Sequence, residues 1–125
     1  MGVYTGIAQD NVTITSGNAV LQSVRVTNNA PPAIKTASFT LGANENYVIC
    51  EGAAANVTVT LPAASSAPGR VVVIKNLSAT YTVISASSNV KPIGSNTAGT
   101  AICAASAGAW ALLVSDGTNW VTMAS

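Results

Sequence analysis

Carboxylates are the first residues of this chain to consider for acid–base chemistry, and they are few. The 125-residue sequence has no histidine, and its acids are Asp10, Glu45, Glu51 and Asp116. Hydrolysis of a glycoside needs two carboxyl groups flanking the scissile bond. Glu45 and Glu51, six residues apart in a predicted pair of strands, are the best candidates for such a pair. We expect both to be solvated instead, so the sequence predicts no enzyme and no catalytic residue.

The two cysteines do not form a metal site. Cys50 and Cys103 lack the close spacing of zinc-binding cysteines. Each lies in a short apolar run that is typical of a strand, and we expect two small, buried, hydrophobic side chains. A disulfide between them stays open, because their distance in space cannot be read from the sequence. The glycines are scattered singly and form no phosphate-binding loop, so we expect no metal and no cofactor.

Charged side chains are scarce. They make up 7% of the chain, against about 25% in typical proteins, and the net charge is +1. This balance lacks the positive patch that nucleic acid or an anionic membrane would attract, so neither is an expected partner. Arg70 and Lys75 flank an apolar strand. We interpret them as edge or rim charges that resist strand stacking, or as salt-bridge partners of a neighbouring subunit.

Trp110 and Trp120 lie on either side of the last predicted turn. The aromatic residues of the chain are too few and too widely spread to form a base-stacking platform. The two tryptophans can pair across neighbouring strands, and we expect them to anchor the core or an interface. Stacking of a sugar on one exposed tryptophan is the alternative.

The hydrophobic pattern predicts strands and no helix. Residues 56–61 alternate strictly, whereas residues 71–77 form a continuous apolar run that we expect to be buried on both faces. Residues 110–114 and 120–123, joined through Asp116-Gly117, form the clearest hairpin. Many short strands between frequent turns predict an all-β fold. We expect a single small antiparallel β-sandwich or barrel, jelly-roll-like, with an extended N-terminal arm.

Two adjacent prolines divide the chain into an arm and a domain. Pro31 and Pro32 each remove a backbone donor and follow strand-like runs at residues 12–15 and 19–27. We therefore expect an N-terminal arm with short strands over residues 1–35 and a β-sandwich or barrel domain over 36–125. The first residues carry no basic region and no long apolar run, which predicts synthesis in a cytoplasm without a secretory signal.

The composition also predicts self-association. Aromatic residues make up only 5% of the chain, and most of the larger aliphatic side chains are valines, so the core is light. A small domain buries a smaller share of its surface than a large one. Burial of additional apolar area between subunits, at about 25 cal/mol per Å², would add stability. A surface with so few charges also protects poorly against association, so we expect an oligomer.

Three segments, in this order and spacing, resemble a β-rich module of tail-fibre and head-associated proteins of tailed bacteriophages. They are residues 56–62 (NVTVTLP), 69–76 (GRVVVIKN) and 113–120 (LVSDGTNW), and the resemblance covers residues 36–123. It implies a virion protein that is not an enzyme and that assembles as a homotrimer. The family has no catalytic motif, so no site residue is transferred.

Within that resemblance, a capsid decoration (cement) protein fits best, because the chain is short and shows no repeat and no heptad pattern. The expected partners are other copies of the chain and the major capsid protein, with residues 1–35 as a capsid anchor and the domain displayed on the particle surface. The alternative is a short tail-fibre or head-fibre module that binds a host surface glycan.

Overall fold

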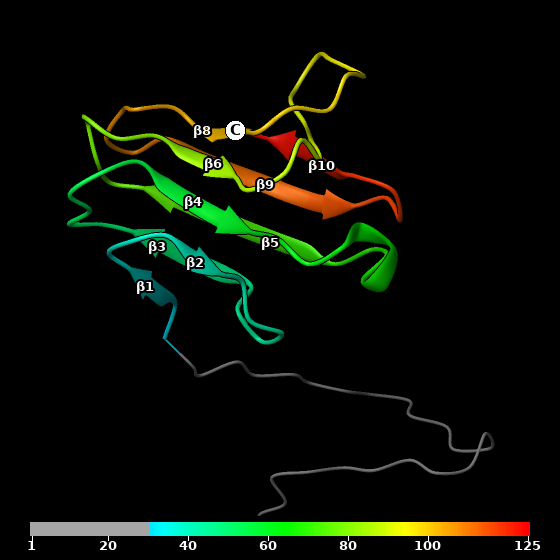
Figure 1. The fold of residues 1–125 in the computed structure, drawn as a ribbon, viewed down its shortest axis with the longest axis horizontal. Helices are drawn as coiled ribbons and strands as arrows, with labels where there is room; N and C mark the ends of the chain where they lie inside the picture. The colour runs from blue at the N-terminus through cyan, green and yellow to red at the C-terminus, as the bar shows by residue number, and fades with distance from the viewer. Residues whose placement is uncertain (1–30) are drawn as a thin grey trace, which may run out of the picture.

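The computed structural model of the protein describes residues 31–125, which form ten strands and one short 3-10 segment. Figure 1 shows their course in space. The elements are β1 Ala33–Lys35, β2 Phe39–Thr40, β3 Tyr47–Cys50, β4 Val57–Thr60, η1 Ala64–Ser66, β5 Val71–Asn76, β6 Val83–Ser85, β7 Val90–Lys91, β8 Ala101–Cys103, β9 Trp110–Ser115 and β10 Trp120–Ala124.

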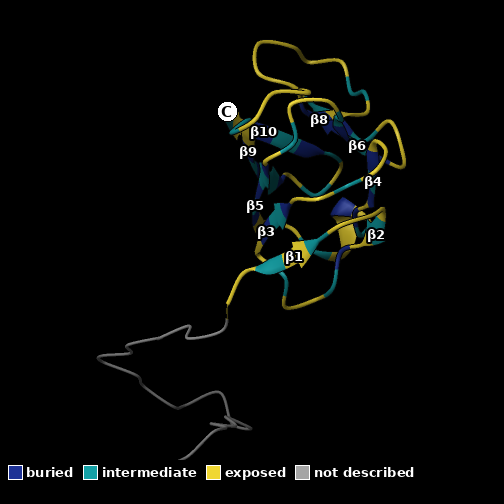
Figure 2. Ribbon diagram, turned by 90° about the vertical axis from the view of Figure 1, so that its left-hand side faces the viewer, coloured by how far each residue is buried: buried dark blue, intermediate teal, exposed yellow. Residues whose placement is uncertain are grey.

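The strands form two sheets that pack face to face. The six-stranded sheet has the order β1-β3-β5-β9-β10-β7, and the four-stranded sheet has the order β2-β4-β6-β8. Figure 2 shows the two layers of strands, with the buried residues of each coloured dark blue. The predicted all-β fold, a small β-sandwich, is confirmed. Within the described residues 31–125, no helix has the length and apolar character that crossing a membrane requires.

The path of the chain differs from the expected antiparallel arrangement. From β1 to β9, every strand lies in the sheet opposite to the strand before it. The chain thus winds around the core, and successive coils place β3 parallel to β1 and to β5, and β4 parallel to β2 and to β6. Antiparallel pairs of named strands are β5–β9, β9–β10 and β6–β8, and an isolated antiparallel bridge joins Val90 of β7 to Gly99. The sandwich is therefore mixed and not jelly-roll-like.

The predicted hairpin is confirmed, and β9–β10 is the only sequential pair of named strands that lies within one sheet. Asp116 shapes its turn, because its Oδ1 accepts hydrogen bonds from the backbone N–H groups of Thr118 (2.8 Å) and Asn119 (2.7 Å). Gly117 has a φ of 90°, which suits glycine. Asp116 therefore has a backbone role, as expected, and these hydrogen bonds lower its pKa.

The core lies between the two sheets and is built from alternate residues of each strand. Val48 and Cys50 of β3, and Val72 and Ile74 of β5, are almost completely buried. Trp120 is the largest fully buried side chain, and its Nε1 donates a 2.9 Å hydrogen bond to the carbonyl oxygen of Pro62. This bond connects the hairpin to the loop between β4 and β5 and satisfies the indole N–H.

Most of the predicted N-terminal arm, residues 1–30, lies outside the described residues, as do Asp10 and the predicted strands at 12–15 and 19–27. The last three residues of the predicted arm, Ala33–Lys35, form β1 at one edge of the six-stranded sheet. The chain has thus already joined the sandwich three residues before the predicted domain start at residue 36.

A buried asparagine holds one end of the sandwich together. The Asn76 side chain is 1% exposed, and its Nδ2 donates to the carbonyl oxygens of Tyr81 (2.9 Å) and Ala104 (2.8 Å). Its Oδ1 accepts a 3.1 Å hydrogen bond from the backbone N–H of Ser78. One side chain therefore ties β5 to the loops that lead into β6 and away from β8, and meets the requirement that buried polar groups be paired.

We predict that Asn76→Ala destabilises the protein by about 2 kcal/mol, because three hydrogen bonds are lost around a buried site. Chemical denaturation monitored by tryptophan fluorescence measures the change. The matched control is Asn44→Ala, in the exposed turn between β2 and β3, which should change stability by less than about 0.5 kcal/mol. Equal effects of the two substitutions would contradict the role assigned to Asn76.

Candidate interaction surface

The outer face of the six-stranded sheet is apolar although it faces solvent. Alternation sends one residue of each pair into the core and the next one outward. The outward side chains include Tyr47 (59% exposed), Val71 (45%) and Trp110 (38%). We call this surface the apolar face. Its described residues are Ile34, Tyr47, Ile49, Val71, Val73, Trp110, Leu112, Val114, Val121 and Met123.

The register of the strands arranges these side chains in rows across the sheet. Tyr47 of β3 pairs with Val73 of β5, which pairs in turn with Leu112 of β9. A second row joins Val71 and Val114, and Val114 also pairs with Val121 of β10. Paired residues on one face lie about 4.5–5.5 Å apart, so the rows form a continuous surface and not scattered hydrophobic residues.

The other outer face of the sandwich is built differently. On the four-stranded sheet, Val57 and Val59 point inward, and Thr58 and Thr60 of the same strand point outward. Thr40 of β2 pairs with Thr60, which extends the threonine surface to the neighbouring strand. Ile84 of β6 pairs with Thr58 and also points outward, so this face combines one large apolar side chain with several hydroxyl groups. The outer face of the six-stranded sheet is the more apolar of the two.

Lys75 projects from the apolar face, but it is not an edge charge. Strand β5 lies between β3 and β9, in the interior of the six-stranded sheet. The edge interpretation is therefore wrong, because β5 pairs with β3 on one side and with β9 on the other. The Lys75 ammonium donates a 2.9 Å hydrogen bond to the carbonyl oxygen of Gly108, which holds it near the margin of the face.

Arg70 stabilises a loop at the other end of β5. Its Nη2 donates to the carbonyl oxygens of Gly42 (2.7 Å) and Glu45 (3.1 Å), both in the loop between β2 and β3. Arg70 Nε is buried and has no hydrogen-bond partner among the described residues. Arg70 therefore lies at the rim of the apolar face, as expected, and binds backbone oxygens of its own chain.

Glu45 is paired, contrary to the expectation that it is solvated. Its carboxylate lies 2.7 Å from the ammonium of Lys35 and accepts a 2.9 Å hydrogen bond from the backbone N–H of Gly42. The bond to Lys35, followed by the one to Gly42, lowers the pKa of Glu45. A general acid of a glycosidase needs a raised pKa, so this environment does not suit Glu45 to that role. Glu51 is exposed, as expected.

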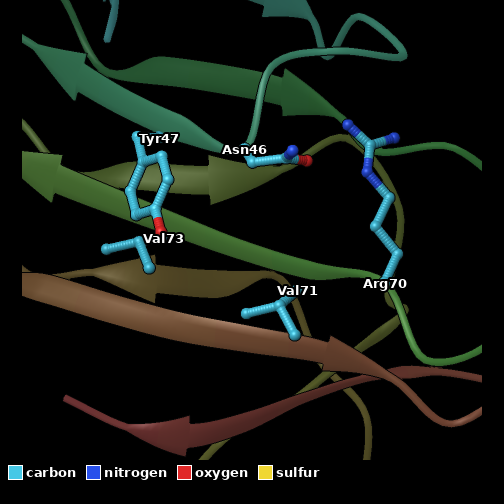
Figure 3. A pocket seen from close by; sticks show the side chains of 5 residues that line it. All are labelled: Asn46, Tyr47, Arg70, Val71 and Val73. Atoms are coloured by element: carbon cyan, nitrogen blue, oxygen red, sulfur yellow. The ribbon is translucent and has the colours of Figure 1, made fainter. Parts of the chain in front are cut away.

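A hollow of about 330 Å³ opens beside Tyr47 on the apolar face. Figure 3 shows Asn46 between the Tyr47 ring and the Arg70 guanidinium, with Val71 and Val73 of β5 below them. A second hollow of about 250 Å³ lies on the other side of Tyr47, and Pro31, Asn44 and Glu45 are among the residues that line it. Tyr47 therefore projects between two depressions.

The two tryptophans have different environments and do not pair with each other. Trp110 lies opposite Lys75 on the apolar face, whereas Trp120 lies opposite Ser115 and is 0% exposed. Trp120 has the expected core position, whereas the interface role of Trp110 stays a prediction. Trp120 is not available as an interface or glycan contact, because its ring fills the space between the sheets. Tyr47, not selected from the sequence, is the more exposed aromatic residue of the face.

Cys50 and Cys103 are free, buried thiols, as the apolar runs around them predicted. Burial raises the pKa of Cys50 to about 11 and that of Cys103 to about 12, and the proximity of Cys50 adds to the second shift. Both thiols are therefore protonated near neutral pH. The part of the chain that the structure describes contains no cluster of three or more metal-binding side chains.

Comparison with known proteins gives no match, neither to a family model nor to a curated protein or a solved structure.

We predict that Glu45→Gln makes stability less dependent on pH in the acid range. Because folding lowers the pKa of Glu45 below its usual value of 4.5, its contribution is present above that value. It is lost as the pH falls through the folded pKa. Urea denaturation between pH 7 and pH 3 should show a steeper loss of stability for the wild-type protein. At pH 7, the substitution should cost roughly 0.5–1 kcal/mol.

Glu51→Gln is the matched control, because Glu51 is exposed. It should leave the acid-range profile close to that of the wild-type protein. Identical profiles for the wild-type protein and Glu45→Gln would show that the Lys35–Glu45 pair does not contribute to folding.

Proposed function

We propose that this protein is a structural component of a virion: a homotrimeric capsid decoration protein that stabilises a phage head. The observation that carries the proposal is the apolar face, on which side chains typical of a protein interior are exposed to water. Exposed apolar areas of this kind mark sites of protein association. The sequence resemblance of residues 36–123 to phage virion modules supports the choice of particle.

The proposed mechanism is cross-bridging. A trimer that contacts several neighbouring capsid subunits can bind the assembled shell. Separated subunits do not offer it a comparable binding site. Preferential binding to the assembled state stabilises that state by mass action, without a new covalent bond. The sandwich suits this role because its loops are fixed by local hydrogen bonds, as in the Asp116 turn and the Arg70-bound loop.

This role predicts that the purified full-length protein binds to phage heads that lack it. It should co-sediment with such heads at a fixed, saturable number of copies and raise the temperature at which they release their contents. Serum albumin at the same concentration is the control for trapping in the pellet. Absence of retained protein on intact heads would overturn the decoration role.

Glycan binding is a second candidate function, and the hollow beside Tyr47 favours it. An exposed aromatic ring, the amide of Asn46 and the guanidinium of Arg70 line this hollow. Aromatic rings pack against the apolar faces of sugars, while amide and guanidinium groups donate hydrogen bonds to hydroxyl or carboxylate oxygens.

Under this second function, the wild-type protein should bind members of an array of bacterial surface glycans. Tyr47→Ala should weaken that binding at least about tenfold, because the stacking surface is lost. Thr58→Ala, on the outer face of the other sheet, should leave it unchanged. Failure of the wild-type protein to bind any glycan of the array would count against this function.

A further inference from the structure

We infer that the apolar face is an interface between copies of this chain, and that its occupant is the same face, or its rim, on a second copy. The inference rests on the proposed function, because it names the partner that covers the surface on which that function depends. It concerns a defined set of side chains, and it can be tested without any virion.

The first argument comes from strand β5. Val72 and Ile74 are 0% exposed in the core, while Val71 and Val73 project from the opposite side of the same strand. A strand that is apolar on both faces is typical of sheets that are covered on both faces. Within the described residues of one chain, the four-stranded sheet covers only the inner side. The outer side of β5 therefore has the composition of a covered surface and lacks its cover.

The second argument concerns charge. Lys75 and its neighbours Ile49 and Trp110 form one row of the face, and the Lys75 ammonium already bonds to Gly108. The central row, Tyr47–Val73–Leu112, carries no charge. A second apolar face can cover this central row without burying an ion. The rows on either side each contain a lysine, Lys75 or Lys91, whose ammonium is hydrogen-bonded to a neutral oxygen, so both ammonium groups must stay at the margin of the contact. Every copy has the same apolar face: a two-fold contact of face with face covers two such faces, and a three-fold contact of face with rim covers three.

The third argument concerns size and shape. Six strands of two to six residues, about 4.8 Å apart and with about 3.3 Å per residue, give a face of about 400 Å². A stable interface buries about 800 Å² on each partner. Residues at the rim must therefore contribute to the contact. The rim provides both projections and depressions: Tyr47 and Met123 are 59% and 62% exposed, and hollows lie beside Tyr47 and beside Trp110.

Native mass spectrometry and light scattering of the full-length protein, over a series of concentrations, test this inference. The wild-type protein should have a mass of two or three chains of 12.4 kDa. Val73→Lys places a charge in the central row and should raise the dissociation constant at least about tenfold. Thr58→Lys is the matched control, since Thr58 is also half-buried and lies on an interior strand of the other sheet. It should leave the mass unchanged.

Circular dichroism establishes whether each variant is folded. If Val73→Lys does not fold, Tyr47→Ser takes its place, because a side chain that is 59% exposed contributes little to the fold of one chain. A folded face variant that keeps the wild-type mass overturns the inference, as does equal dissociation of Thr58→Lys. A wild-type protein that stays at the mass of one chain also overturns it. Retention on phage heads decides the decoration role separately, and a dimer would exclude only the proposed trimer.

Discussion

The uncovered side of the six-stranded sheet is the constraint on which the rest of this structure depends. The core is thin, because most strands contribute only every second side chain to it, and Trp120 is its one fully buried aromatic residue among residues 31–125. An equally apolar set of side chains lies on the outer side of β3, β5 and β9. Within residues 31–125, these outer side chains are only partly shielded from water. Association would remove their remaining exposed area from water, at about 25 cal/mol per Å².

The winding of the chain explains how so few charged residues suffice for the fold. Almost every connection crosses from one sheet to the other, so the loops lie at the two ends of the sandwich. There, backbone groups that belong to no ladder need partners, and short polar side chains provide them. Asn76, Asp116 and Glu45 each bind backbone N–H or carbonyl groups of nearby loops. These bonds fix the loops locally and leave the broad faces of the sheets to be determined by other requirements.

The sequence predicted the local features well, and the relations between distant strands poorly. The hairpin of β9 and β10 could be predicted because the Asp116-Gly117 turn has a strong local signature. The parallel coils could not, because alternation of apolar and polar residues is the same in parallel and antiparallel neighbours. The order of the strands within a sheet has no local signature either, so the sequence does not show that β5, which carries Lys75, lies in the interior of its sheet. The register of β9 and β10 decides which of the two tryptophans enters the core. It places Trp120 between the sheets and Trp110 on the outer side.

The candidate surface, in contrast, had a signal in the sequence. Residues 71–77 were expected to be buried on both faces, and the structure covers only one of them. This difference locates the surface, because a further layer of protein on the outer side of β5 would bury these residues on both faces, as expected. The threonines on the outside of the four-stranded sheet strengthen the argument, since they show what this chain places on a face that stays in water. A low content of charge is then a requirement of the fold: an unpaired ion on the apolar face would oppose burial of that face.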